Sequence, residues 1–237
     1  MKNALITAAT KGIGRAISIA LATEGINVAV CARGEKDLAD LKAELTAINP
    51  NIKIFTAATD VSVKAQILKF AADSEKELGT ISIIVNNAGI YEPYSILDDK
   101  EDTFQKSIDT NLAPAYELYR YFGKKMMAAG EGHIFNICSV ASLNPVVGAG
   151  TYSVTKFALL GLTKVMRLEL QAHNVKVTAV IPGSTLTSSW DGTEVDKNVM
   201  VMPEDIASAI VNIYKMSPGA NVDEIIIKPV NGQVLKI

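Results

Sequence analysis

The segment ALITAATKGIGRAISIALATEG (residues 4–25) decides the fold. Its first four residues form an apolar run typical of a buried strand, and the residues from Gly14 onward have helical character. Gly12 and Gly14 therefore lie at a strand-to-helix turn, where free N–H groups and the positive end of the helix dipole favour a phosphate group. Glycine also lets a ligand approach the backbone closely. The segment predicts a strand, a phosphate-binding loop and a helix, although a glycine pair alone is weak evidence for a nucleotide site.

The rest of the chain repeats this strand-then-helix pattern. Nearly continuous apolar runs, typical of strands covered on both faces, occur at residues 27–32, 52–57, 81–85, 133–138, 175–181 and 224–228. One segment between them has the three- or four-residue spacing of a helix face that packs on a sheet: Val63, Ile67, Phe70, Ala71, Ser74 and Leu78. Strands that alternate with helices predict right-handed crossovers and a parallel sheet. We expect residues 1–237 to form a single doubly wound α/β domain.

The least regular part of the chain is residues 183–202, which are rich in Ser, Thr and Asp. They follow the sixth predicted strand, at the edge where α/β sheets bind ligands. We interpret this segment either as a substrate lid or as a plain surface loop.

Composition and charge exclude several classes of function. The formal net charge of −2 lacks the basic excess of a nucleic-acid-binding protein. Cys31 and Cys138 lie in apolar runs and are interpreted as buried hydrophobic residues, while His133 and His173 are too far apart for a local metal site. No apolar run approaches the roughly 18 residues of a membrane helix, and no signal peptide precedes the first strand. These features predict a soluble cytoplasmic protein without a metal.

Two cations indicate the kind of nucleotide. The second predicted strand ends in Ala32 and Arg33, where an NAD-binding unit would place a carboxylate on the ribose 2′-hydroxyl. Lys11 stands immediately before Gly12. Two cations without an acid at this end of the fold favour a ribose 2′-phosphate, so NADP(H) is preferred and NAD(H) remains possible. The alternative is that both are solvated surface charges.

Tyr152 and Lys156 are the first catalytic candidates, because a spacing of four places both on one face of a helix. Tyr121 and Lys125 repeat the spacing, but only Tyr152 follows by thirteen residues a serine, Ser139, at the end of a strand. We expect Lys156 and an oxidised nicotinamide ring to lower the pKa of Tyr152 from about 10 towards neutrality, which takes about 4 kcal/mol. Tyr152 would then donate its proton to a carbonyl oxygen that Ser139 holds.

Asn111 is a further candidate. It lies three residues before Pro114, which lacks an N–H and disrupts helical hydrogen bonding. We hypothesise that a carbonyl near Asn111 binds a water molecule and that this water links Lys156 to solvent as a proton relay.

A series of short motifs resembles the short-chain dehydrogenase/reductase family in its shorter single-domain form. Spread over nearly the whole chain, the motifs are Thr7, Gly12, Gly14, NNAG at 86–89, Asn111, Ser139, Tyr152, Lys156, PG at 182–183 and Thr187. The resemblance implies a Rossmann fold with seven parallel strands in the order 3-2-1-4-5-6-7 and helices on both faces. It also implies that Asn111, Ser139, Tyr152 and Lys156 form the catalytic set, and that the protein is a homodimer or homotetramer.

The resemblance extends the cofactor site beyond Lys11 and Arg33. By it, Asp60 and Val61 would meet the adenine, residues 87–89 the ribose, and residues 185–187 the nicotinamide amide. The complete predicted set is Thr7, Thr10, Lys11, Gly12, Ile13, Gly14, Arg33, Asp60, Val61, Asn87, Ala88, Gly89, Tyr152, Lys156, Pro182, Gly183, Thr185 and Thr187.

Two departures from the family pattern bear on function. Ala8 replaces the first loop glycine, at a cost of about 1 kcal/mol if the position requires positive φ. The C-terminal segment VDEIIIKPVNGQ (residues 222–233) lacks the glycine pair that many 3-oxoacyl-carrier-protein reductases carry near their end. This weakens, without excluding, that assignment.

The expected function is NADP(H)-dependent reduction of a ketone or aldehyde to an alcohol, a reversible reaction on a small-molecule substrate. Alternatives are a 3-oxoacyl-carrier-protein reductase and a non-catalytic NADP-binding regulator. A sugar-nucleotide epimerase and a methyltransferase fit less well, because the chain is short for the former and the latter has no use for Tyr152 and Lys156. Four loop residues are candidates for the substrate pocket: Tyr91, Asn144, Val146 and Trp190.

Overall fold

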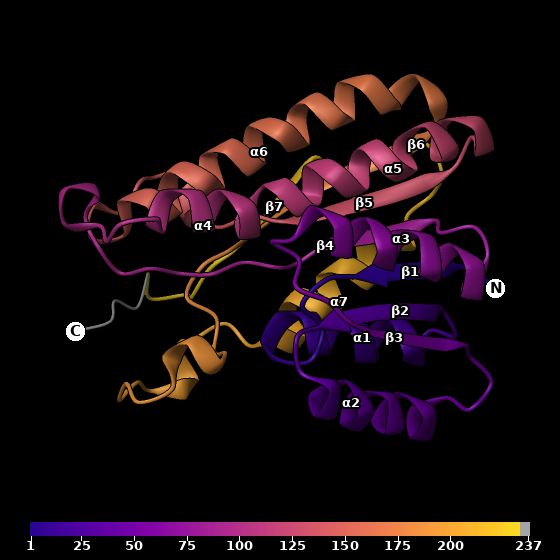
Figure 1. Cartoon of the computed structure of the whole chain (residues 1–237), viewed down its shortest axis with the longest axis horizontal. Helices are drawn as coiled ribbons and strands as arrows, with labels where there is room; N and C mark the ends of the chain where they lie inside the picture. Colours follow the sequence, from indigo (N-terminus) through magenta and orange to yellow (C-terminus); the bar gives the residue numbers. More distant parts are fainter. Residues whose placement is uncertain (233–237) are drawn as a thin grey trace.

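Seven parallel strands form one sheet in the order β3-β2-β1-β4-β5-β6-β7 (Figure 1). The structure is a computed structural model and describes residues 1–232. The strands are β1 (Asn3–Ile6), β2 (Asn27–Ala32), β3 (Ile54–Ala58), β4 (Ile83–Asn86), β5 (Gly132–Ile137), β6 (Val175–Pro182) and β7 (Glu224–Ile227). The parallel arrangement and the strand order are those expected from the sequence, and each predicted run lies within two residues of the strand it forms.

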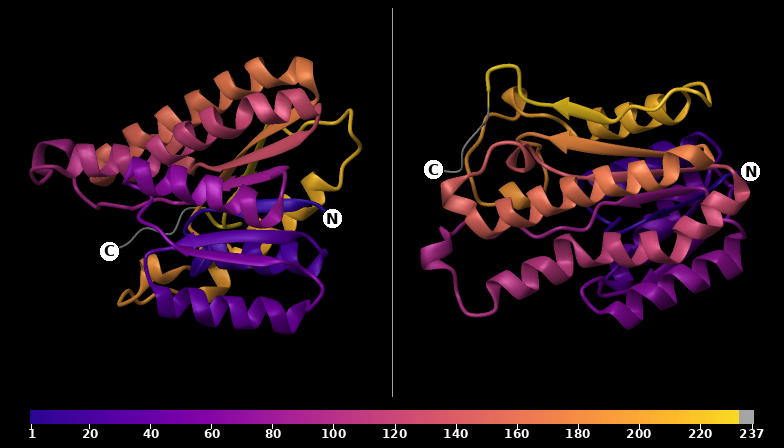
Figure 2. Two further views of the ribbon diagram at one scale, coloured as in Figure 1. Left: turned by 45° about the vertical axis from the view of Figure 1, so that its right-hand side comes forward. Right: turned by 90° about the horizontal axis from the view of Figure 1, so that it is seen from above.

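Helices cover both faces of the sheet (Figure 2). They are α1 (Gly12–Thr23), α2 (Glu35–Ile48), α3 (Lys64–Leu78), α4 (Thr103–Asn111), α5 (Ala113–Ala129), α6 (Gly150–Leu170) and α7 (Pro203–Tyr214). Alternate strand residues enter two separate cores. Ala4 and Ile6 of β1 pack with α1, α2 and α7, whereas Leu5 packs with α3, α5 and α6. This doubly wound packing explains the continuous apolar runs, because both faces of the five inner strands are buried, while the edge strands β3 and β7 are partly exposed.

The helical stripe predicted after residue 63 is confirmed with one correction. Ile67, Phe70, Ala71, Ser74 and Leu78 are buried on α3, but the Val63 side chain is 42% exposed. Val63 precedes the first turn of α3 and therefore does not share the buried face of the helix.

The predicted disruption before Pro114 is also present. Helix α4 ends at Asn111, Leu112 has non-helical angles of φ −123° and ψ −53°, and α5 begins at Ala113. Pro114 stands in the first turn of α5, where its missing N–H costs no helical hydrogen bond.

The carboxyl ends of the strands face one edge of the molecule, where the glycine loop and the 183–202 segment meet (Figure 1). The 183–202 segment contains two short 3₁₀ turns, Ser188–Trp190 and Lys197–Val199. A backbone bridge between Thr185 and Val201 closes its base. Within residues 1–232, no helix combines the length and the apolar character that crossing a bilayer requires.

Candidate active site

The turn from β1 to α1 has the backbone geometry of a tight anion-binding loop. Ala8 and Gly12 both have φ of +52°. A Cβ on Gly14 would lie 2.4 Å from Asn87 Nδ2 and 2.5 Å from the Ala8 carbonyl oxygen, so only glycine fits. No described side chain caps the amino end of α1, whose first N–H groups face the loop. The Ala8 position therefore has the left-handed conformation that disfavours alanine.

Thr7 and Asn87 hold this loop against the end of β4. Thr7 is 1% exposed, and its Oγ1 accepts hydrogen bonds from the backbone N–H groups of Asn87 and Ala88 at 3.0 and 3.1 Å. Asn87 Nδ2 donates to the carbonyl oxygens of Thr7 and Ala8, each at 3.0 Å. Thr7 and Ala88 therefore shape the loop, and Ala88 is only 8% exposed. Asn87 also shapes the loop and, in addition, lines the cleft.

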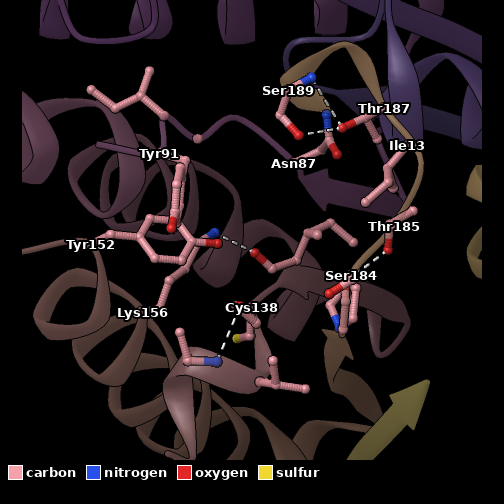
Figure 3. Close-up of a pocket in the computed structure, with 18 of the residues that line it drawn as sticks. Ile13, Asn87, Tyr91, Cys138, Tyr152, Lys156, Ser184, Thr185, Thr187 and Ser189 are labelled. Carbon is pink, nitrogen blue, oxygen red and sulfur yellow. Dashed lines mark hydrogen bonds between the residues drawn. The ribbon is translucent and has the colours of Figure 1, made fainter. Parts of the chain in front are cut away.

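Ser139, Tyr152 and Lys156 meet in a cleft of about 340 Å³. Ser139 follows β5, and its Oγ accepts the Ala141 N–H at 3.1 Å while its O–H is directed to Tyr152. Tyr152 hydrogen-bonds Ser139 and projects from the first turns of α6. Lys156 lies one turn later and is 4% exposed, and its Nζ donates to the Ile137 carbonyl oxygen at 2.8 Å (Figure 3). The three predicted side chains therefore form one cluster.

Burial has the largest effect on the pKa values of Tyr152 and Lys156. Burial raises the pKa of Tyr152, and the Ser139 hydrogen bond opposes this only in part. Burial lowers the pKa of Lys156. The chain's own residues therefore move the pKa of Tyr152 upward, because desolvation of the phenolate outweighs the Ser139 hydrogen bond.

Asn111 lies behind the cluster and is 2% exposed. Its Oδ1 accepts the Ile90 N–H at 2.8 Å, and its Nδ2 donates to the Ile90 carbonyl oxygen at 3.1 Å and to Thr155 Oγ1 at 3.0 Å. A Cβ on Gly89 would lie 3.4 Å from Lys156 Nζ and 3.6 Å from Asn111 Oδ1. The amide of Asn111 therefore ties α4 to the segment after β4 and to α6, immediately beside Lys156.

The two predicted 2′-phosphate cations are not free of acids, which corrects the sequence interpretation. Lys11 Nζ lies 3.3 Å from a carboxylate oxygen of Asp37, in the first turn of α2. The Ser62 hydroxyl, assisted by the positive charge of Arg33, lowers the pKa of Asp60. Sequence reasoning missed Asp37 because its contact with Lys11 depends on how α2 packs beside α1.

Residues after β6 form the opposite wall of the cleft (Figure 3). Pro182, Gly183, Thr185 and Thr187 line it, as does Ile13 from α1. The Cβ position of Gly12 lies 3.0 Å from Thr187 Cγ2, so the 183–202 segment touches the glycine loop. Of the remaining predicted residues, Thr10 lies in that loop, and Val61, after β3, packs on the core beneath α3.

Three of the four proposed pocket residues line the cleft. Tyr91, Val146 and Trp190 do so, and the Tyr91 ring lies edge-on to the Tyr152 ring at 5.0 Å between centroids. Asn144 is not among the described lining residues. Ser184 and Ser189 also line the cleft, and the sequence analysis did not single them out.

The second Tyr-x-x-x-Lys pair lies elsewhere. Tyr121 Oη and Lys125 Nζ contact Glu75 Oε2 at 3.1 and 2.5 Å, in a network between α5 and α3. Cys31 and Cys138 are buried free thiols. Among residues 1–232, no group of His, Cys, Asp or Glu side chains is placed to hold a metal ion.

Comparisons with known proteins give a consistent result. A family model described as short chain dehydrogenase matches residues 2–198. Sepiapterin reductase from Chlorobaculum tepidum is 32% identical over 97% of both chains. Glycine betaine reductase ATRR from Emericella nidulans is 32% identical over 96% of this chain, which spans 19% of that longer protein. A solved structure of a metagenomic short-chain oxidoreductase in complex with NADP has a TM-score of 0.85, at 30% identity over 97% of both chains.

The family match covers most of the chain, and the seven-stranded parallel sheet agrees with it. The chain belongs to the short-chain dehydrogenase family.

Proposed function

We propose that the protein is an NADP(H)-dependent oxidoreductase that reduces a ketone or aldehyde to an alcohol, reversibly. The observation that carries the proposal is the convergence of Ser139, Tyr152 and Lys156 on one cleft whose opposite wall is the segment after β6. A proton donor, a hydroxyl that can hold a carbonyl oxygen and a buried ammonium are the groups that carbonyl reduction requires.

The residues present fit a dinucleotide. Gly14 lets Asn87 pack against the turn between β1 and α1, and the uncapped amino end of α1 in that turn suits a pyrophosphate. Asn87, Gly89 and the segment from Pro182 to Thr187 would hold the ribose and nicotinamide. Lys11 and Arg33, both exposed, would hold a 2′-phosphate and support NADP(H) over NAD(H). The bound cofactor would supply a hydride to the carbonyl carbon.

Three side chains would orient the carbonyl group, donate the proton and stabilise the resulting phenolate. The Ser139 O–H donates to the carbonyl oxygen and orients it. Tyr152 gives that oxygen a proton, and its raised pKa keeps the phenol protonated at neutral pH, which suits the reductive direction. Lys156, held by the Ile137 carbonyl, stabilises the phenolate that remains.

The test follows NADPH and NADH absorbance with a panel of ketones, aldehydes and oxo-esters, for the wild type and two variants. Tyr152→Phe should lower kcat by about 100-fold or more, because removing a general acid typically costs 10²–10⁴-fold. Tyr121→Phe is the matched control, since it removes the same hydroxyl from the second Tyr-x-x-x-Lys pair. Equal turnover by Tyr152→Phe and the wild type would refute the mechanism.

The same experiment tests the alternative that the protein is a non-catalytic NADP-binding regulator. That alternative predicts cofactor binding without turnover of any substrate, in the wild type as in Tyr152→Phe. A cytoplasmic location, a homo-oligomeric state and a lid role for residues 183–202 belong to the proposal as well. The lid role is supported by the contact between Thr187 and Gly12, which joins this segment to the glycine loop.

A further inference from the structure

The substrate side of the cleft is uncharged. Once the residues proposed to face the cofactor are set aside, its main walls are Tyr91, Ser139, Val140, Val146, Tyr152 and Trp190. Among all described lining residues Lys156 is the only one with a charge. Its side chain is 4% exposed, and its ammonium already donates to the Ile137 carbonyl oxygen. An anionic group that entered the cleft would therefore have no described lining side chain available to form an ion pair with it.

A carboxylate or phosphate in such a cleft loses its hydration without gaining an ion pair, which strongly disfavours binding. Contact with aromatic and aliphatic walls instead favours the binding of an apolar substrate, because its apolar surface is buried away from water. The ring of Tyr91, which stands edge-on to Tyr152, places an aromatic surface directly beside the proton donor.

The two loops that continue from the cleft walls are acidic. Residues 91–102, which begin at Tyr91, contain five carboxylates and one lysine, and residues 183–202, which include Trp190, contain three carboxylates and one lysine. Asp98, Glu101, Asp191 and Glu194 are exposed. Figure 2 (right) shows both loops at the end of the molecule to which the arrows of β6 and β7 point. Their negative potential disfavours the approach of anions, including thioesters on phosphate-bearing carriers.

Resting on the proposed function, we infer that the substrate is a free aldehyde or ketone without negative charge, with an apolar or aromatic body. The inference excludes oxo-acids and coenzyme- or carrier-bound acyl thioesters as preferred substrates.

Two matched substrate pairs test the inference. Methyl 4-formylbenzoate and 4-formylbenzoate share an aldehyde and an aromatic ring but differ by one remote charge. We expect kcat/KM for the ester to exceed that for the acid by about thirtyfold or more. Acetoacetyl-N-acetylcysteamine and acetoacetyl-coenzyme A share the reacting ketone but differ in phosphates. The former should be preferred by about tenfold, with the gap narrowing at high salt.

A pair of variants tests the cleft directly. The Val146 side chain lines the cleft and is 37% exposed, whereas its neighbour Val147 is 85% exposed and is not among the lining residues. Val146→Lys should raise kcat/KM for 4-formylbenzoate, relative to its methyl ester, by about tenfold, because the new ammonium pairs with the carboxylate. Val147→Lys adds the same charge outside the cleft and should leave the ratio within about twofold of the wild type. NADPH titration by fluorescence checks that both variants remain folded and bind cofactor.

The outcomes separate the two proposals. If the acid matches the ester, if the coenzyme thioester is preferred, or if Val147→Lys changes the ratio as much as Val146→Lys, the inference is wrong while the proposed function stands. If NADPH binds but no carbonyl compound is reduced, the proposed function fails and the inference with it.

Discussion

Ala8 holds a left-handed backbone conformation, with φ of +52°, that costs an alanine roughly 1–2 kcal/mol. Glycine avoids this strain but loses about 0.5–1 kcal/mol to unfolded-state entropy. We expect Ala8→Gly to stabilise the protein by up to about 1 kcal/mol, a rise in Tm of about 2–4 °C. Cofactor affinity should change by less than about threefold, because glycine can keep the same φ of +52°. Ala9→Gly is the control and should destabilise, since Ala9 is buried and has no positive φ. A large gain in NADPH affinity for Ala8→Gly would show that the alanine distorts the loop.

We expect Asp37 to influence the choice of cofactor, since it lies 3.3 Å from Lys11. Its carboxylate competes for the ammonium that we assign to the 2′-phosphate, and it repels that phosphate. An exposed pair of this kind is worth about 0.2–1 kcal/mol, so Asp37→Asn should tighten NADPH binding by about two- to fivefold. NADH binding should stay the same or weaken. Fluorescence titration measures both constants, with Asp40→Asn, exposed on the same helix, as the control. If the ratio of NADPH to NADH affinity is unchanged in Asp37→Asn, Lys11 does not bind the 2′-phosphate.

His133 makes stability depend on pH. Burial, assisted by the charge of Lys176, lowers its pKa to about 3. Its Nε2 contacts Thr178 Oγ1 at 2.8 Å, while no described group hydrogen-bonds Nδ1. The unfolded chain, with a histidine pKa of about 6.5, binds more protons between pH 3 and 6.5, so the free energy of unfolding rises with pH over this range. The stability is fully present above pH 6.5 and is lost as pH falls towards 3, by at most about 1.4 kcal/mol per pH unit for this group.

Urea unfolding at pH 7.5, 6.0 and 5.0 measures this dependence. His133→Gln should reduce the slope between pH 6.5 and 5, whereas His173→Gln, at an exposed position, should not. If both variants keep the wild-type slope, the acid sensitivity comes from other groups.

At the scale of elements, Asn111 joins three pieces of structure at the break between α4 and α5. Asn111→Ala removes the partners of the Ile90 N–H and carbonyl groups, which should cost about 1–3 kcal/mol of stability. The relay hypothesis further predicts that kcat at neutral pH falls by more than about tenfold. Thr155→Val removes the third hydrogen bond but leaves those to Ile90, and should keep kcat within about twofold. Unchanged turnover in Asn111→Ala would refute the relay, and equal losses in both variants would leave Asn111 only a structural role.

For the molecule as a whole, features with a local signal were predictable from the sequence. The inner strands were visible because both of their faces are buried, and the Tyr152 and Lys156 pair was visible because helical spacing is fixed. Contacts between elements distant in the chain were not, as the Asp37 carboxylate beside Lys11 shows. The burial that raises the pKa of Tyr152 was not predictable either, because it depends on the packing of the complete fold; the expected fall in that pKa relies on an oxidised nicotinamide ring as well and stays a prediction.

Helix α6 presents an exposed apolar stripe on which a second copy of the chain could pack. Helix α6 carries Val154, Phe157, Val165 and Leu168 three or four residues apart or at multiples of that spacing, and each is 42–67% exposed. Gly161 lies in the middle of this stripe, and a Cβ there would meet no described atom within 4 Å. An exposed apolar stripe with a small central residue suits close packing against the same helix of a second copy. We expect a homodimer or a dimer of dimers, as the family resemblance implies.

Val165→Glu should shift the assembly to smaller species in light scattering and lower the Tm, because the carboxylate would be buried without a partner. Thr46→Glu places the same charge on an exposed position of α2 and should leave the mass unchanged. A wild-type monomer at tens of micromolar, or identical masses for Val165→Glu and the wild type, would show that the α6 stripe is not the interface.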